Sequence, residues 1–232
     1  WHNAYEETIR VPMIVSSPLV NGSQTEMREV HQPTSSIDLA PTLLGLAGLC
    51  ENQVRRAMED SGIATVKPLA GADLSAHVRG ICAGQIKGPD GKRRSGVFFM
   101  TDDMITEKGD NPDDPKPDQY EAFLTSVEDR IAEGHDLASG PVLQPNNVRA
   151  LCTGDWKLVR YVDPAGVEAD EWELYCLTAD PVEETNLVDF ATGQLRADAA
   201  VPGMTQENLT SKLEGLKEEL ARQESLAFDT TA

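Results

Sequence analysis

Residues Asn147 to Leu187 read NVRALCTGDWKLVRYVDPAGVEADEWELYCLTADPVEETNL and contain three short runs that are typical of β-strands. The predicted strands cover residues 148–153, 156–163 and 171–177. Gly154 lies in the tight link between the first two, because glycine tolerates the positive φ that such turns require. The sequence DPAG at 163–166 is a turn signal between the second and third. We therefore predict an antiparallel meander.

Alternation of side chains assigns the faces of these predicted strands. The third strand places Trp172, Leu174 and Cys176 on one face and Glu173 and Tyr175 on the other. In the second strand apolar and charged residues alternate less regularly. That pattern suits a strand with one face in solvent.

The composition is that of a globular protein with an acidic surface. The chain has 232 residues, 40% of them hydrophobic, and a formal net charge of −19. This length corresponds to one or two domains and is sufficient for a substantial core. A strong negative charge argues against binding to nucleic acid and to anionic membrane surfaces. No apolar run approaches the roughly 20 residues that a membrane span needs.

The cysteines give little evidence for a metal site. The chain contains Cys50, Cys82, Cys152 and Cys176, and no two of them form a CxxC pair. Cys152 and Cys176 both fall in predicted strands, where buried thiols and a disulfide are equally compatible with the sequence. The cysteine content leans slightly towards a reducing compartment, so a cytoplasmic location is weakly preferred.

The N-terminal residues predict a short helix followed by a buried strand. Asn3 and Glu6 have the spacing of a capping box for a helix over residues 4–9. Residues 11–15 form a continuous apolar run, which is typical of a strand buried on both faces. The chain begins at Trp1, and we expect the neighbours of this strand to lie in an N-terminal half that precedes it. Without them, an exposed edge would favour self-association.

An apolar stripe at helical spacing predicts the next helix. The stripe consists of Ile37, Ala40, Leu43, Leu44 and Ala47. Ser35 or Ser36 can cap its N-terminus, and Gly48 is suited to the position that follows its C-terminus.

Shorter elements complete the prediction. Surface helices are expected over residues 51–60 and 72–79, a strand over 95–100, a helix from 118 to about 134, and a last helix over 205–226. The last helix carries an apolar seam of Leu209, Leu213, Leu216 and Leu220, and its Glu218 and Arg222 can pair across one turn. The acidic, proline-rich residues 101–118 could be a calcium loop or a solvated loop. The solvated loop is favoured, because the EF-hand spacing is missing.

Four ordered segments resemble the sulfatase family. They are YEETIRVPMIV at 5–15, DLAPTLLGLAG at 38–48, KPLAGADLSAHVRG at 67–80, and CTGDWKLVRY at 152–161 followed by EWELYCLTADPVEETNLV at 171–188. Each segment alone is a weak signal, but the four in this order are a strong one. Cys176 departs from the pattern, since the family usually has Asp there.

The resemblance implies the C-terminal part of an α/β, alkaline-phosphatase-like fold. Residues 1–95 would be the tail of the catalytic α/β domain. Residues 96–232 would form a C-terminal subdomain with a small antiparallel sheet, a C-terminal helix and an acidic insertion at 101–145.

The resemblance also implies hydrolysis of small-molecule sulfate esters. Sulfatases use a formylglycine made in a C/S-x-P-S-R motif together with a divalent metal, usually calcium. This chain has no such motif, and neither GxSxG nor HExxH occurs in it. We therefore expect formylglycine and metal to belong to the N-terminal half, and this segment alone to contain no catalytic residue or metal ligand. Alternatives are a phosphonate or phosphate ester hydrolase of the same superfamily and a non-catalytic acidic interaction module.

One residue is a candidate for contact with substrate. In the family, the segment around Trp1 and His2 borders the sulfate pocket, so His2 is the candidate substrate-binding residue. The other histidines are scattered along the chain and are typical of surface or packing positions. Glu6 and Glu7 are adjacent on the predicted helix and do not face each other; a role for them in fixing Arg10 is favoured over acid–base catalysis.

Overall fold

The computed structural model describes residues 3–21, 27–64, 66–82, 84–102, 119–137, 145, 147–163, 166 and 168–228. The helices are α1 (Glu6–Ile9), α2 (Pro18–Asn21), α3 (Leu39–Leu46), α4 (Glu51–Asp60), α5 (Ser75–Val78), α6 (Gln119–Ala132) and α7 (Gln206–Phe228), with a 3₁₀ turn at Ser36–Asp38. The strands are β1 (Val97–Asp102), β2 (Asn147–Cys152), β3 (Trp156–Val162) and β4 (Glu171–Cys176). These elements confirm the predicted α/β class with its antiparallel sheet and C-terminal helix.

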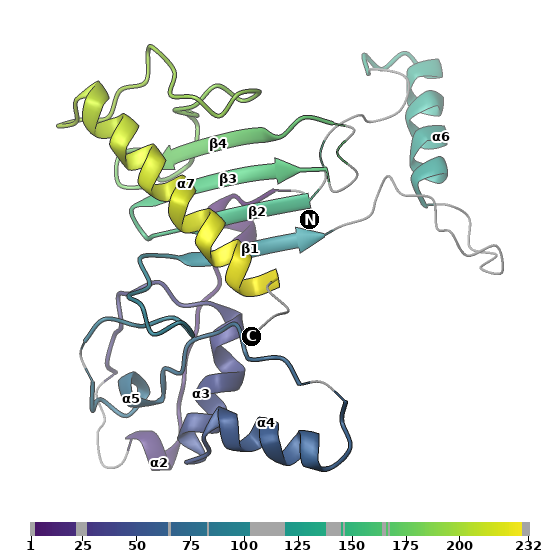
Figure 1. Ribbon diagram of the computed structural model, residues 1–232. Helices are drawn as coiled ribbons and strands as arrows, with labels where there is room; N and C mark the ends of the chain where they lie inside the picture. The colour runs from purple at the N-terminus through teal and green to yellow at the C-terminus, as the bar shows by residue number, and fades with distance from the viewer. Residues whose placement is uncertain are drawn as a thin grey trace.

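The sheet has the order β1-β2-β3-β4, and every neighbouring pair is antiparallel (Figure 1). β2, β3 and β4 are the predicted meander. Gly154 in the link between β2 and β3 has a φ of 94°, as predicted. The Thr153 hydroxyl accepts the Trp156 N–H at 3.0 Å and so closes this turn. The sequence therefore predicts both the strands and the first connection.

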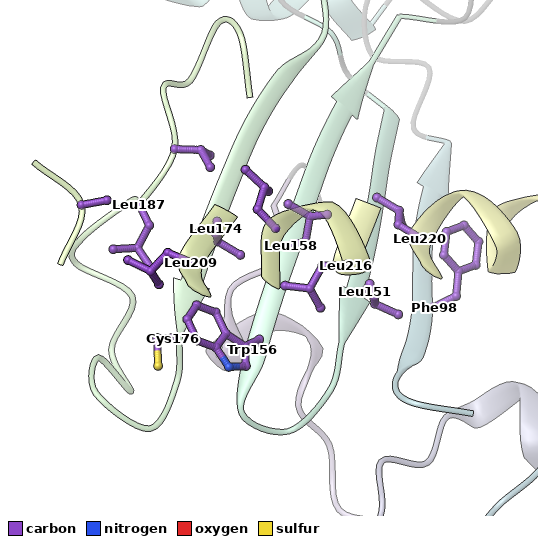
Figure 2. Packing of buried hydrophobic residues seen from close by; sticks show 13 residues of the cluster. Phe98, Leu151, Trp156, Leu158, Leu174, Cys176, Leu187, Leu209, Leu216 and Leu220 are labelled. Carbon is purple, nitrogen blue, oxygen red and sulfur yellow. The ribbon is translucent and has the colours of Figure 1, made fainter. Parts of the chain in front are cut away.

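α7 runs across one face of the sheet and forms the main core with it (Figure 1). All four leucines of the predicted seam are buried there. Figure 2 shows Leu209, Leu216 and Leu220 above side chains of the strands, among them Leu158 and Trp156. The apolar seam thus packs on the predicted meander, with Trp156 in the same cluster and Trp172 partly buried against it.

The predicted pairing of Glu218 with Arg222 is wrong. The Arg222 guanidinium instead donates to both Glu219 carboxylate oxygens at 2.7 Å and contacts Asp90. A spacing of three residues also places two side chains on one helix face. The loop that carries Asp90 lies on that side of α7, so the tertiary contact selects Glu219.

The opposite face of the sheet is not in solvent, contrary to the prediction for β3. The segment of residues 3–9 covers it, and Ala4 packs there against Val148, Ala150 and Val159. Both faces of β3 are therefore buried along most of its length. Irregular alternation in this strand reflects two covered faces and a buried lysine, Lys157, on the face that the N-terminal segment covers.

The predicted strand at residues 11–15 is absent from the structure. These residues form no strand, and no described strand pairs with them. The side chains of Val11 and Ile14 are 72% and 80% exposed. A continuous apolar run predicts burial, but it does not say which polypeptide provides the cover.

The predicted stripe on α3 is likewise not buried. Leu43 is 63% exposed, whereas the inward face of this region carries Asp38, Pro41 and Thr42. The ends of the helix were predicted correctly. The Ser35 N–H donates to the Asp38 carboxylate at 2.9 Å in a capping box, and Gly48 has a φ of 73°. Capping of this region is thus encoded locally, while the buried face depends on distant partners. The capping box predicted for Asn3 and Glu6 is wrong, because α1 begins after Tyr5 without a side-chain cap.

The remaining elements agree with the predictions in outline. α4 coincides with the predicted surface helix, α5 lies within its predicted range, and α6 ends before Gly134, whose φ is 93°. Residues 103–118, which include most of the acidic loop, lie outside the described residues. All four cysteines are free thiols, so Cys152 and Cys176 do not form a disulfide.

Candidate functional site

A buried ion cluster joins the N-terminal segment to the sheet. Lys157 extends from β3 towards α1, and its Nζ lies 2.7 Å from Glu6 Oε1 and 2.8 Å from Glu183 Oε1. The side chains of Lys157 and Glu183 are fully buried, and that of Glu6 is 20% exposed. Buried charges of this kind are stable only when they are paired.

The loop after β4 is shaped so that Glu183 enters this cluster. Glu183 has a φ of 58°, an uncommon value for a residue with a side chain. Asp180 stabilises the loop, because its carboxylate accepts the N–H groups of Glu184 at 3.1 Å and Thr185 at 2.9 Å. Glu183 in turn accepts the backbone N–H of Glu6 at 2.7 Å through its second oxygen. The loop with the sequence DPVEET at 180–185 therefore binds the start of α1 through Glu183.

A carboxylate held by tyrosines lies beside the ion cluster. The hydroxyls of Tyr5 and Tyr161 donate to the two oxygens of Glu173 at 3.2 Å and 2.9 Å. The ring of Tyr175 lies 6.2 Å from that of Tyr5, centre to centre. Burial raises the pKa of Glu173, although the hydrogen bonds from the tyrosines oppose the shift. Burial, and then the Glu173 carboxylate, raise the pKa of Tyr161 and Tyr175.

We expect Glu173 to make stability depend on pH. A carboxyl whose pKa is raised in the folded state favours folding fully below its unfolded pKa of about 4.3, and this contribution is lost as the pH rises through the folded pKa. The free energy of unfolding of the wild type should therefore fall, relative to that of Glu173→Gln, from about pH 4 upwards. Urea unfolding of both proteins at a series of pH values measures the difference. Parallel curves would contradict the assignment, and Glu184→Gln, at an exposed position, is the control.

A second buried ion pair organises the region around α3. Arg94 donates to both oxygens of Asp38, at 2.7 Å and 2.8 Å. Asp38 also accepts the N–H of Ala72 at 2.8 Å, and Thr42 accepts that of Leu74 at 2.9 Å. The Asp38 side chain is fully buried, and that of Arg94 is 6% exposed. The bonds from Ala72 and Leu74 connect the sulfatase-like segments at 38–48 and 67–80, and Arg94 binds the buried Asp38 carboxylate at this junction in a bidentate pair.

The described residues also form an open groove of about 560 Å³ beside α5. Met13, Val30 and Leu74 contribute apolar surface to it, and His31 and His77 line it as well. His77 Nε2 lies 2.8 Å from the Gly84 carbonyl oxygen, and His31 is exposed near Glu29. The structure therefore brings two of the scattered histidines to one groove, but each has its own local contact.

The described residues do not form a metal centre. No group of three or more His, Cys, Asp or Glu side chains among them could hold a metal ion. Carboxylates that cluster among the described residues face cationic side chains or the tyrosine hydroxyls, as Glu6 and Glu183 face Lys157 and as Asp102 and Glu224 face Arg149. Cys152 is the neighbour of Lys157 across β2 and β3. Burial raises the pKa of the Cys152 thiol to about 12, although the charge of Lys157 opposes the shift. The thiol is therefore protonated at neutral pH. The Lys157 cluster and the Arg94–Asp38 pair are thus suited to holding segments of the chain together.

The predicted substrate contact, His2, lies outside the described residues. The predicted role of Glu6 in fixing Arg10 is minor, because Arg10 is 81% exposed and its nearest contact with Glu6 is 3.6 Å. Sequence reasoning did not identify Lys157, Glu173 or Glu183 as cluster members. The available signal was the position of all three within the segments 152–161 and 171–188 that resemble the sulfatase pattern.

Comparisons with known proteins agree with the motifs. The family model described as Sulfatase matches residues 1–49. An arylsulfatase of Chlamydomonas reinhardtii is 27% identical over 207 residues, which cover 83% of this chain and 24% of that protein. The chain thus spans about a quarter of the length of this curated relative. Among the described helices, none has the length and apolar character to cross a membrane. The two matches, one in the N-terminal segment and one along most of the chain, confirm its resemblance to the sulfatase family.

Proposed function

We propose that this chain is the C-terminal portion of a sulfatase, a hydrolase of small-molecule sulfate esters. The observation that carries the proposal is the similarity to an arylsulfatase over 83% of the chain, which extends well beyond the 49 residues matched by the family model. Since the chain corresponds to only 24% of that relative, most of the enzyme would lie in other residues.

In this proposal the formylglycine and the divalent metal, calcium in the usual case, are held by that other part. The sequence has no C/S-x-P-S-R motif. The carboxylates of Glu6 and Glu183 share Lys157 as their cationic partner, and that of Asp38 is bound by Arg94. An ammonium or guanidinium group thus occupies the place that a divalent cation would need. The role assigned to this chain is therefore to support and complete the catalytic domain.

Exposed apolar side chains support the proposal that another part of the enzyme covers this surface. Val11, Ile14 and Leu43 are 72%, 80% and 63% exposed, and all three belong to the segment that the family model matches. Large apolar patches that remain in solvent mark sites of association. We propose that the rest of the catalytic domain covers them. The isolated chain would then tend to self-associate through the same surface.

Ester selectivity of the complete polypeptide tests the proposal. Its kcat/KM should be higher for an aryl sulfate than for the aryl phosphate or phosphonate with the same leaving group. Preference for the phosphorus esters would assign the protein to that branch of the superfamily. Absence of turnover with all three esters, after the polypeptide is shown to be folded and loaded with calcium, would favour a non-catalytic module.

His2 is the residue of this chain that we propose to contact substrate in the complete enzyme. A protonated imidazole could donate a charge-assisted hydrogen bond to a sulfate oxygen. His2→Ala should then lower kcat/KM for the aryl sulfate about tenfold, which corresponds to roughly 1.4 kcal/mol, with an unchanged melting temperature. Unchanged kinetics would remove His2 from the site.

A further inference from the structure

The ion cluster connects two parts of the chain that the family comparison separates. Glu6 lies inside residues 1–49, which the Sulfatase model matches, whereas Lys157 and Glu183 belong to the sheet subdomain beyond the match. Glu6 is bound at two points: its side chain contacts Lys157 at 2.7 Å, and its backbone N–H donates to Glu183 at 2.7 Å. Both the position and the orientation of the start of α1 are therefore defined.

Burial explains why these contacts are specific. Lys157 is fully buried in a sheet that is covered on both faces, so its ammonium group has little access to water. Its interaction with a carboxylate is stronger there than at the surface, because the effective dielectric constant is lower. Movement of Glu6 away from the sheet would leave Lys157 with Glu183 alone, and it would also remove the N–H donor from Glu183. The observed position of α1 is thus preferred over displaced ones.

Contacts of the residues beside Glu6 also hold the start of α1 on the sheet. Tyr5 donates to Glu173, and Ala4, which is 1% exposed, packs against Val148 and Val159. These three adjacent residues, Ala4, Tyr5 and Glu6, therefore meet the sheet by apolar packing, a hydrogen bond to a carboxyl group and an ion pair. The exposed Glu7 on the same short helix makes no such contact among the described residues and provides a matched comparison.

We propose that Glu6, Lys157 and Glu183 form an ionic clamp that fixes residues 4–9, and that Lys157 is through it a positioning residue for sulfate ester hydrolysis. The second half of this statement rests on the proposed function. In this proposal the sheet subdomain is a rigid support for residues 1–49, the segment that the family model matches. Small displacements of positioned groups can reduce turnover about 100-fold, so the clamp is expected to affect kcat.

Hydrogen exchange of the 232-residue chain tests the clamp independently of any activity. The informative amides are those of Glu6, which donates to Glu183, and of Thr8 and Ile9, which donate to the Tyr5 carbonyl. In Glu6→Gln these amides should exchange at least tenfold faster, while amides of β3 keep their protection. In Glu7→Gln all should exchange as in the wild type. Equal exchange in the two variants would overturn the clamp.

Kinetics of the complete enzyme test the positioning role. With an aryl sulfate, Glu6→Gln should lower kcat about tenfold with a smaller change in KM, and Glu7→Gln should leave both unchanged. The double variant Glu6→Gln, Lys157→Met should lose less kcat than the product of the two single-variant losses predicts. The reason is that the effects of residues that act as one unit are not additive. Equal kcat values for Glu6→Gln and Glu7→Gln would overturn the positioning role.

The two measurements separate the clamp from the proposed function. Faster exchange in Glu6→Gln supports the clamp even when the complete polypeptide hydrolyses no sulfate ester, and in that case it is the proposed function that fails. Normal sulfate turnover together with equal exchange in both variants overturns the clamp alone.

Discussion

Replacement of Arg94 by methionine is expected to lower the free energy of unfolding by about 3–5 kcal/mol, the usual cost of leaving one partner of a buried ion pair without the other. Asp38 is fully buried and accepts two hydrogen bonds from Arg94, so the variant leaves a carboxylate with no positive partner at that position. Urea denaturation monitored by circular dichroism measures the loss.

Arg93→Met is the matched control, since Arg93 is the exposed neighbour of Arg94 in the same loop. It should change the free energy of unfolding by less than about 0.5 kcal/mol. Adding Asp38→Asn to Arg94→Met should recover part of the stability, because the buried charge is then removed. Equal, small effects of the two arginine variants would show that the pair does not hold this region.

Truncation of Leu216 to alanine is expected to cost about 2–5 kcal/mol, the range for large-to-small changes in a well-packed core. Leu216 is 6% exposed and belongs to the cluster between α7 and the sheet (Figure 2). Lys212, one turn earlier, is exposed, and its ammonium lies 5.9 Å from the centre of the Trp156 ring. Lys212→Ala should therefore cost less than about 1 kcal/mol.

Thermal and urea unfolding of both α7 variants give the comparison. A large loss in Leu216→Ala alone shows that the helix is part of the folded unit. Equal, small losses at both positions would mean that α7 contributes little to the stability of the sheet.

The parts of the fold that depend on local signals were predictable from the sequence. Turn residues such as Gly154 and the regular spacing of leucines on α7 identified the meander and its covering helix. Capping of the α3 region by Ser35 and the end of that helix before Gly48 could also be predicted. In each case the interacting groups are close in sequence, or one helical face is uniformly apolar.

The parts that depend on distant partners were not predictable. The burial of Lys157 cannot be predicted from the alternation in β3, because its partners Glu6 and Glu183 are remote in sequence from it and from each other. The apolar residues 11–15 were assigned to a buried strand, although hydrophobicity does not identify the polypeptide that covers it. Likewise, the inward face of the α3 region is set by the pairing of Asp38 with Arg94, which outweighs the apolar stripe.

We propose that this chain supports a sulfatase active site whose catalytic groups lie in other residues. Aryl sulfate hydrolysis, measured side by side for the 232-residue chain and for the complete polypeptide, both with calcium, tests this proposal. We predict turnover by the complete polypeptide and none by the chain alone. If the chain alone turns over the ester and a single substitution within residues 1–232 abolishes this activity, the catalytic groups lie in this chain and the proposal is wrong.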